Sequence, residues 1–252
     1  MIYIVINSKG GVGKSTFSNQ ILAHYLYEKN KKQKTKLIEI DDENEDSKIL
    51  KDSEILTSKL ISTNKINTID EIFLEDKDVV IDVGGNKTAT IFLKELENIE
   101  LDDNVTFCIP LGTGIQDVAN AKDTQIAINK IQQNAKIIFV LSSNKGDDIE
   151  DDYVQFFGSK FIDTKFQINS DKYVVINYDS VLNNSKSFNK TYYDISNNKT
   201  DFWKLAKEAQ KEQNTEDKDY YLFMNRFKKK AIIYREYIEN DVFNRLDELL
   251  ER

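Results

Sequence analysis

Ten consecutive residues near the start of the chain, NSKGGVGKST at positions 7–16, could bind phosphate. Glycines at 10, 11 and 13 allow backbone N–H groups to converge on one point without clashes from β-carbons. An apolar run precedes them, and an expected helix follows, whose first N–H groups are unpaired and carry partial positive charge. The segment therefore predicts a cradle for the phosphates of a nucleotide.

Side chains of this loop extend the same chemistry. Lys14 would reach the β- and γ-phosphates, Ser15 would bind Mg²⁺, and Thr16 would bond the α-phosphate. The common pattern for such loops, G-x-x-x-x-G-K-[ST], requires glycine where this chain has Ser8. A glycine turn that is followed by lysine without function is the alternative, and the order of strand, loop and helix disfavours it.

The stretch KGGVGKST (9–16) resembles the deviant Walker A motif of the ParA/MinD family of dimeric ATPases. The resemblance implies ATP and Mg²⁺ as cofactors. It also implies that Lys9 crosses a dimer interface to the nucleotide of the other subunit, where a cation stabilises charge on the transferred phosphoryl group. A solvated loop lysine is the alternative for Lys9. The nucleotide contacts that the resemblance implies in this loop are Gly10, Gly11, Val12, Gly13, Lys14, Ser15 and Thr16.

Two further segments match the family. KLIEIDDENEDS (36–47) ends a strand in acidic residues, and the resemblance makes Asp41, two after Glu39, the residue that positions the attacking water. The family commonly continues with Pro-Gln, whereas this chain has Asp42 and Glu43, either of which could share that role.

KDVVIDVGGN (77–86) resembles the Walker B segment, so that Asp82 with Ser15 would hold Mg²⁺. The same segment reads D-x-x-G, in which the N–H of Gly85 could sense the γ-phosphate. An ordinary capping aspartate is the alternative for Asp82.

Weaker matches to the family concern the contacts to the purine base of the nucleotide and the dimer interface. IPLGTG (109–114) corresponds to a loop near the family's dimer interface, and LSSNK (141–145) and INYDS (176–180) fall where the family contacts the purine. Asn144 is the candidate for the base, ahead of Asn177, and both could instead be turn asparagines. His24, the only histidine, lies near the apolar face of the first helix, where a structural role is expected.

The elements that must position these residues follow from apolar patterning. Continuous apolar runs separated by helical segments indicate an α/β fold, a mostly parallel sheet of the P-loop NTPase type with helices on both faces. The expected strands are 2–6, 36–40, 78–83, 104–110, 135–142 and 172–178, and the expected helices include 14–29 and 114–133. Segment 43–77 is polar and weakly patterned, which favours a variable region.

After about residue 196 the pattern becomes purely helical, and two appended C-terminal helices are expected, the last one long. The resemblance covers residues 1–195. We therefore expect an ATPase domain over 1–195 and a helical extension over 196–252 that packs on or beside it.

The composition excludes several classes of protein. One cysteine, Cys108, excludes intramolecular disulfides and a cluster that needs two cysteines per chain. The N-terminus lacks a signal peptide, no apolar run approaches the ~18 residues of a membrane span, and the C-terminal end is acidic, so a cytoplasmic protein without membrane attachment is expected. The net charge of −8 opposes DNA binding by the whole surface and leaves it to a local patch.

Two basic stretches could form such a patch, 28–36 and 226–235. The second is favoured because partition members of the family place DNA contacts toward the C-terminus, although solvated lysines are an equal alternative for each. Its basic residues are Arg226, Lys228, Lys229, Lys230 and Arg235.

The resemblance thus implies a partition ATPase. It would form an ATP-dependent homodimer, bind DNA nonspecifically on the nucleoid, and hydrolyse ATP slowly until a centromere-binding or other partner protein stimulates it. A conjugation or mobilisation ATPase that recruits a relaxase, and a nucleotide-dependent protein scaffold with little hydrolysis, are the alternatives.

Overall fold

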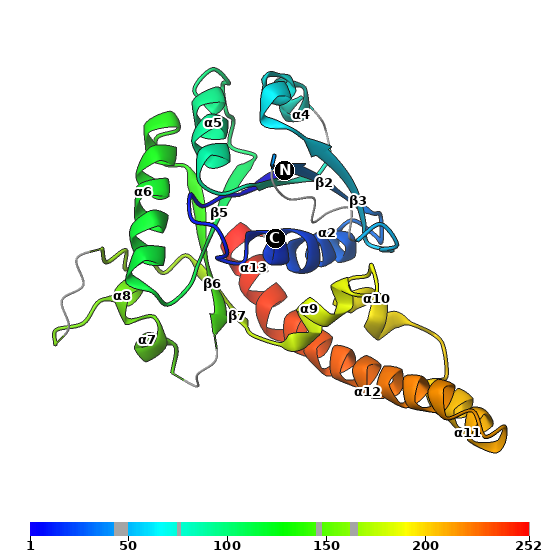
Figure 1. The fold of residues 1–252 in the computed structure, drawn as a ribbon. Helices are drawn as coiled ribbons and strands as arrows, with labels where there is room; N and C mark the ends of the chain where they lie inside the picture. Colours follow the sequence, from blue (N-terminus) through cyan, green and yellow to red (C-terminus); the bar gives the residue numbers. More distant parts are fainter. Residues whose placement is uncertain (43–49, 75–76, 145–147, 162–165, 252) are drawn as a thin grey trace.

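The computed structural model describes residues 1–42, 50–74, 77–144, 148–161 and 166–251. Seven parallel strands form one sheet in the order β3-β2-β4-β1-β5-β6-β7, with helices on both faces (Figure 1). The predicted α/β fold is confirmed. The strands are β1 Ile2–Val5, β2 Thr35–Ile40, β3 Leu56–Ile61, β4 Val79–Val83, β5 Val105–Leu111, β6 Lys136–Asn144 and β7 Tyr173–Asn177.

Helices connect the strands and continue beyond the last one. They are α1 Lys14–Thr16, η1 Phe17–Leu22, α2 Ala23–Lys29, η2 Thr63–Thr68, α4 Asp70–Phe73, α5 Lys87–Leu96, α6 Ile115–Ile131, α7 Ile149–Asp152, α8 Val154–Phe157, α9 Ser180–Lys186, α10 Tyr192–Asn197, α11 Phe202–Lys211, α12 Thr215–Tyr237, η3 Ile238–Val242 and α13 Phe243–Leu250. Within the described ranges, none of these helices is long and apolar enough to cross a bilayer.

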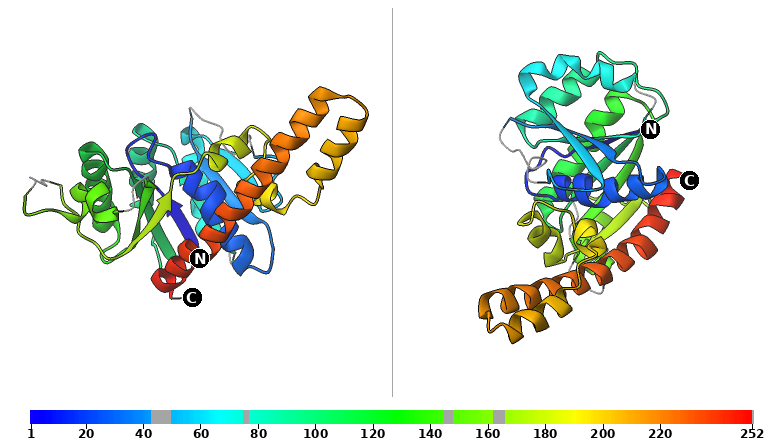
Figure 2. Two further views of the ribbon diagram at one scale, coloured as in Figure 1. Left: turned by 90° about the horizontal axis from the view of Figure 1, so that it is seen from below. Right: turned by 90° about the vertical axis from the view of Figure 1, so that its right-hand side faces the viewer.

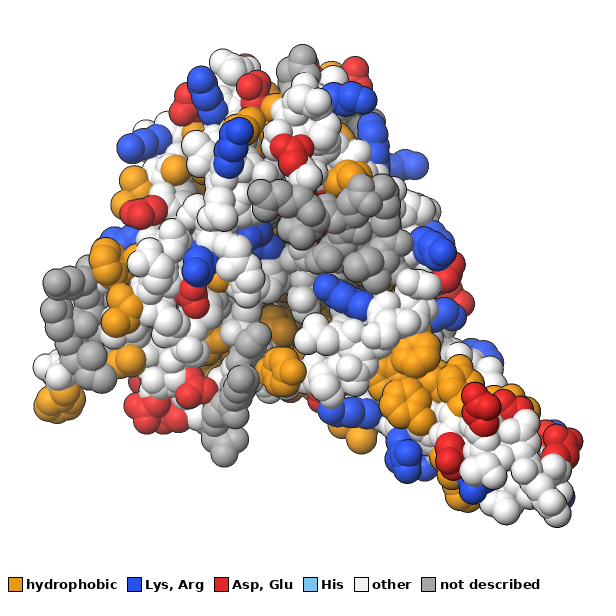
Figure 3. Space-filling view, in the orientation of Figure 1, with side chains coloured by type: hydrophobic (Ala, Val, Ile, Leu, Met, Phe, Trp, Pro, Cys, Tyr) orange, Lys and Arg blue, Asp and Glu red, His pale blue; other side chains and the backbone are white. Residues whose placement is uncertain are grey.

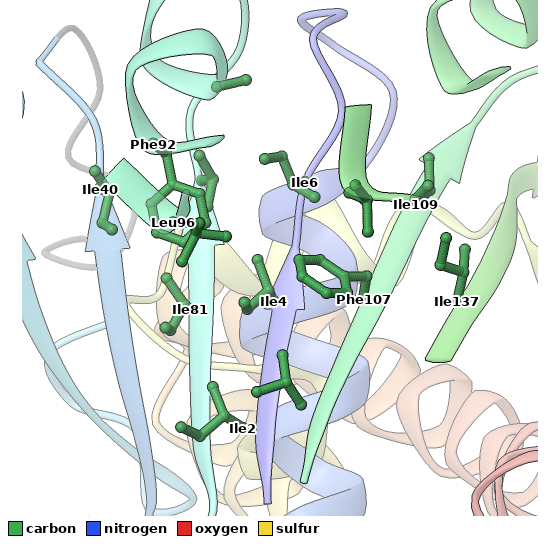
Figure 4. Close-up of a cluster of buried hydrophobic side chains, with 14 of the residues drawn as sticks. Ile2, Ile4, Ile6, Ile40, Ile81, Phe92, Leu96, Phe107, Ile109 and Ile137 are labelled. Carbon is green, nitrogen blue, oxygen red and sulfur yellow. The ribbon is translucent and has the colours of Figure 1, made fainter. Parts of the chain in front are cut away.

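Alternating side chains of the central strands build one core on each face of the sheet. Ile2 and Ile4 of β1 point to the face that α5 and α6 cover, where they meet Phe92 and Leu96 (Figure 4). Tyr3 and the other alternate residues point to the opposite core. Burial on both faces explains why these strands read as continuous apolar runs in the sequence.

The second core joins the helix after the glycine loop to the C-terminal helices. Phe17 and Ile21 of η1 share this core with Phe227 of α12 and Leu246 of α13. The appended helices therefore pack on the sheet, while α11 and the first part of α12 form an antiparallel hairpin that projects from the body (Figures 1 and 2). The domain boundary expected between residues 195 and 196 falls inside α10 and stays a prediction.

The strand β3 was not expected from the sequence. It lies at the edge of the sheet next to β2, and its middle residues Thr57, Ser58 and Lys59 are exposed. Polar and charged side chains suit an edge strand because they discourage pairing with other chains. The same residues hide the apolar pattern by which strands are recognised.

Candidate nucleotide site

The glycine loop connects β1 to α1 and has the conformation that its sequence predicted. Gly11 and Gly13 have positive φ values of 77° and 89°, which are strained for residues with a β-carbon. A β-carbon on Gly13 would also lie 3.0 Å from Oγ of Ser142, at the end of β6. The second half of the loop thus depends on glycine for both its backbone and its close approach to a neighbouring strand.

A cavity of about 300 Å³ opens above this loop at the carboxyl end of the sheet. The predicted phosphate and magnesium residues share it with the predicted water-positioning residue, although they come from three separate segments. Its lining comprises Gly10, Gly11, Gly13, Lys14, Ser15, Thr16, Glu39, Asp41, Asp82, Gly84 and Gly85. The structure therefore brings the loop, the end of β2 and the end of β4 to one place. In open parallel sheets, ligands bind in the crevice at the carboxyl ends of the strands.

Lys14 is buried, and its ammonium donates a hydrogen bond to the carbonyl oxygen of Lys9 (Nζ···O 2.8 Å). Burial lowers the pKa of Lys14, while the carboxylates of Asp82 and Asp41 act in the opposite direction. Its charge thus stands in a poorly solvated position against two acids. An anion such as a triphosphate would gain more from this cation than from a solvated lysine.

Asp82 is the most perturbed acid of the site. Burial and the charge of Glu39 on the neighbouring strand raise its pKa to about 7, against the opposing effects of Ser15 and Lys14. Its Oδ1 is fully buried and has no hydrogen-bond partner among the described residues. A hard cation between the Ser15 hydroxyl and this carboxylate would satisfy that oxygen, so the donor set fits Mg²⁺.

Glu39 and Asp82 occupy paired positions of β2 and β4, and both are buried. Two adjacent buried carboxylates raise each other's cost of ionisation. The two residues are far apart in the sequence, so only the structure shows that they are neighbours. A bound cation would offset the repulsion between their carboxylates, which is a second reason to expect one at the site.

Asp41 lies directly against the turn after β4. A β-carbon on Gly84 would come within 2.9 Å of its carboxyl carbon, and the Gly84 N–H donates to the carbonyl oxygen of Ile40 (2.8 Å). Of the two further acids that could share its role, Asp42 instead accepts hydrogen bonds from the N–H (2.8 Å) and hydroxyl of Thr63, and Glu43 lies outside the described residues. Asp41 is therefore the acid that the turn holds beside the cavity.

The turn after β4 also contacts the glycine loop. The Asn86 N–H donates to the carbonyl oxygen of Ser8 (2.6 Å), and a β-carbon on Gly85 would lie 3.2 Å from the Gly10 nitrogen. Asn86 has a positive φ of 49° just before α5 begins. The segment that the D-x-x-G pattern singled out is thus in contact with the loop, which is the position that a γ-phosphate sensor requires.

Lys9 lines a different cavity from the one that Lys14 lines. Gly112, Thr113, Asp117 and Asp152 line this cavity together with Lys9. Within the described part of the chain, the Lys9 ammonium makes no hydrogen bond or ion pair. Lys9 is half-buried, and its predicted role in the nucleotide site of a second subunit stays a prediction.

The candidate base contacts lie beside the loop. A small cavity is lined by Gly13, Thr16, Asn177 and Tyr178, among others. Asn144 does not line it, but its amide donates to the Asn177 side chain (Nδ2···Oδ1 3.1 Å). The contact to the base predicted for Asn144 is untested, and Asn177 is the better placed of the two. Lys145 of the same predicted loop lies outside the described residues.

Asn7 is a site residue that sequence reasoning missed. Its side chain accepts from the Lys9 N–H (2.9 Å) and donates to the Pro110 carbonyl oxygen (2.7 Å). It thereby fixes the start of the glycine loop to β5. In the sequence it shows only as an asparagine directly after an apolar run, and its full burial is a finding of the structure.

The five basic residues predicted to contact DNA do not all share one face of α12. Arg226, Lys229 and Lys230 are exposed, and Lys230 also pairs with Asp179. Lys228 is half-buried and donates to the Thr200 carbonyl oxygen. Arg235 pairs with Glu239. Figure 3 shows basic and acidic side chains interspersed on one face of the molecule rather than a basic band. Their role in DNA binding is untested.

Comparisons with known proteins agree with the fold. No family model matches the chain, and no curated protein does either. A solved structure of the MinD cell division protein of Aquifex aeolicus superposes with a TM-score of 0.50 at 16% identity and covers 79% of this chain and 91% of that one.

Two further solved structures are similar. A plasmid partition protein of Borrelia burgdorferi B31 bound to AMPPNP has 16% identity and a TM-score of 0.48, with 75% of this chain and 90% of that one covered. The cell division ATPase MinD of Pyrococcus furiosus has 12% identity and a TM-score of 0.49, with 91% and 98% covered. The superposition on the Aquifex aeolicus MinD structure shows that the chain has the fold of that MinD protein, which is the fold expected from the resemblance of residues 9–16.

Proposed function

We propose that this protein is an ATPase that binds ATP and Mg²⁺ in the cavity above the glycine loop. The observation that carries the proposal is the convergence of Lys14, Asp41 and Asp82 on that cavity. Lys14 binds the phosphates, Ser15 and Asp82 hold Mg²⁺, and Asp41 positions the attacking water. A bound magnesium ion supplies charge neutralisation for the transferred phosphoryl group, and the Gly85 N–H senses the γ-phosphate.

Hydrolysis depends on a homodimer in which each chain contributes Lys9 to its partner's nucleotide. Support comes from the Lys9 ammonium, which has no hydrogen bond or ion pair with the residues that the structure describes. Because Lys9 does not line the chain's own nucleotide cavity, its ammonium is available to another molecule. A cation supplied in trans also makes hydrolysis slow until dimers assemble.

The ATP-bound dimer binds DNA nonspecifically in the cytoplasm, on the nucleoid, and a centromere-binding or other partner protein stimulates hydrolysis to drive partition. Arg226 and Lys229 are the exposed cations of the favoured patch that pair with no acid among the described residues, and they carry most of the DNA contact. Because the remaining cations of the patch pair within the chain, this binding is weak and salt-dependent.

The test compares two lysines of the same loop. Lys14→Ala should weaken ATP binding, whereas Lys9→Ala should bind ATP with unchanged affinity and lose hydrolysis that depends on protein concentration. Nucleotide affinity and turnover are measured for both variants. Equal loss of ATP binding in the two variants would contradict the roles assigned here.

A nucleotide-dependent scaffold is the second candidate. The exposed aromatic side chains of the α11–α12 hairpin, Trp203, Tyr220 and Phe223, favour it because such residues are enriched in protein interfaces. ATP-dependent retention on DNA supports the partition ATPase, and ATP binding without DNA retention or hydrolysis supports the scaffold.

A further inference from the structure

Three potential metal ligands meet on the face of the molecule that the C-terminal helices cover. His24 and Glu28 lie one helical turn apart on α2, and Glu239 belongs to η3. His24 Nε2 lies 3.5 Å from Oε1 of Glu28 and 3.4 Å from Oε1 of Glu239. All three ligand atoms lie within 4.8 Å of one another, and theirs is the one such group among the described residues.

The imidazole is held rigidly, yet its Nε2 atom has no hydrogen-bond partner. His24 is fully buried, and its Nδ1 hydrogen-bonds with the Tyr192 hydroxyl (2.6 Å). The rings of Tyr193 and Phe243 pack against it at centroid distances of 4.4 and 4.9 Å. Neither carboxylate contact of Nε2 has hydrogen-bond geometry, so a buried polar atom is aimed between two acids without satisfying either.

The two distances from the imidazole nitrogen to the carboxylate oxygens suit ligands around a small divalent ion. Bonds of about 2.0–2.1 Å in a tetrahedral site place neighbouring ligand atoms about 3.3 Å apart, close to both Nε2–Oε1 distances. Two ligands four residues apart on one helix face, with a third from another element, is a recurrent way to hold zinc. The Nδ1 contact to Tyr192 would fix the orientation of the ring, as outer-shell partners of zinc-bound histidines do.

Each glutamate also contacts a cation. Lys32 pairs with Glu28, and Arg235 pairs with Glu239 (Nε···Oε1 2.6 Å). Lys32 and Arg235 compete with a metal ion for these carboxylates, but the Lys32 side chain is half exposed and can turn into solvent.

We propose that His24, Glu28 and Glu239 form a site for a divalent transition-metal ion such as Zn²⁺, with water as the fourth ligand. Such an ion would join α2, which continues the helix of the glycine loop, to η3 at the base of the projecting hairpin. Its role is structural. It does not rest on the proposed ATPase function, because none of its ligands lines the nucleotide cavity.

The experiment titrates Zn²⁺ into the full chain, stripped of metal and free of nucleotide, by isothermal titration calorimetry. One Zn²⁺ per chain is expected, and Co²⁺ should give the visible absorption bands of a tetrahedral site. Glu28→Gln and Glu239→Gln should each weaken Zn²⁺ binding about tenfold or more. Glu236→Gln, an exposed acid of the same helical segment, is the matched control and should leave the affinity unchanged.

Two further variants sharpen the test. Lys32→Met removes the competing ammonium and should strengthen Zn²⁺ binding, whereas His24→Gln should abolish it. Circular dichroism establishes that each variant is folded, and if His24→Gln is not, the two glutamine variants decide. Absence of one-to-one binding, or equal affinities in Glu28→Gln, Glu239→Gln and the control, would overturn the proposal and leave an ion-pair cluster. Because nucleotide is absent throughout, either result is independent of ATP hydrolysis.

Discussion

Replacing Asp82 by asparagine should stabilise the nucleotide-free protein at neutral and alkaline pH. Burial raises the pKa of this carboxyl from 3.8 to about 7. The folded state therefore keeps a proton that the unfolded state has already lost between about pH 4 and pH 7. The stability that this group contributes is fully present below the pKa of the unfolded state, about 4, and is lost as the pH rises through the pKa of the folded state, about 7.

The size of the effect follows from the shift. A difference of about three pKa units at about 1.4 kcal/mol each gives at most roughly 4 kcal/mol in the free energy of unfolding. Solvent screening takes little from this limit because the residue is only 3% exposed. Asparagine has nearly the same shape and cannot ionise, so Asp82→Asn removes the pH-dependent cost and keeps the packing.

The assay is urea unfolding of the wild type and of Asp82→Asn at about pH 5 and about pH 8, without nucleotide or Mg²⁺. The variant should gain stability relative to the wild type as the pH rises. Asp103→Asn, a change at an exposed acid, is the control and should show no such trend. A stability difference between Asp82→Asn and the wild type that does not change with pH would refute the reasoning.

Two further predictions concern the water-positioning acid and the DNA contact. Gly84→Ala should push the Asp41 carboxylate away, because the new methyl group would lie 2.9 Å from it. ATP turnover should fall about tenfold or more while ATP affinity is retained. Turnover and ATP binding are measured in parallel, and an equal loss of both would contradict the prediction. The double variant Arg226→Ala, Lys229→Ala should weaken ATP-dependent DNA retention. The slope of log affinity against log salt concentration should fall by roughly two per chain. Lys94→Ala, a change at an exposed cation of α5, should alter neither quantity. An unaltered slope in the double variant would show that these two residues do not contact DNA.

The sequence predicted the parts of the site that lie within single segments. The glycine loop and the end of β4 are recognisable because positive φ values demand glycine and because a buried parallel strand is continuously apolar. Contacts between segments were not predictable. The pairing of Glu39 with Asp82 and the fit of Gly84 against Asp41 depend on which strands are neighbours.

The basic stretch 226–235 shows why charge runs are poor guides to surfaces. Consecutive residues of a helix point in directions about 100° apart, so adjacent lysines of α12 face different neighbours. Lys230 reaches Asp179, while Lys229 makes no ion pair with the described residues. Of the five cations in this run, Arg226 and Lys229 make no ion pair with the described residues, and the other three bond within the chain.

The central claim is that Lys9 of one chain acts on the nucleotide of its twin, and mixing two inactive variants tests it most directly. Lys9→Ala and Asp41→Asn chains should each bind ATP and fail to hydrolyse it. In a mixed dimer, the Lys9→Ala chain keeps its own Asp41 and receives Lys9 from its partner, so one site is complete. Equimolar mixing should restore roughly one quarter of the wild-type rate, since half of the dimers are mixed and each has one active site of two. A mixture no faster than the sum of its parts would contradict the account.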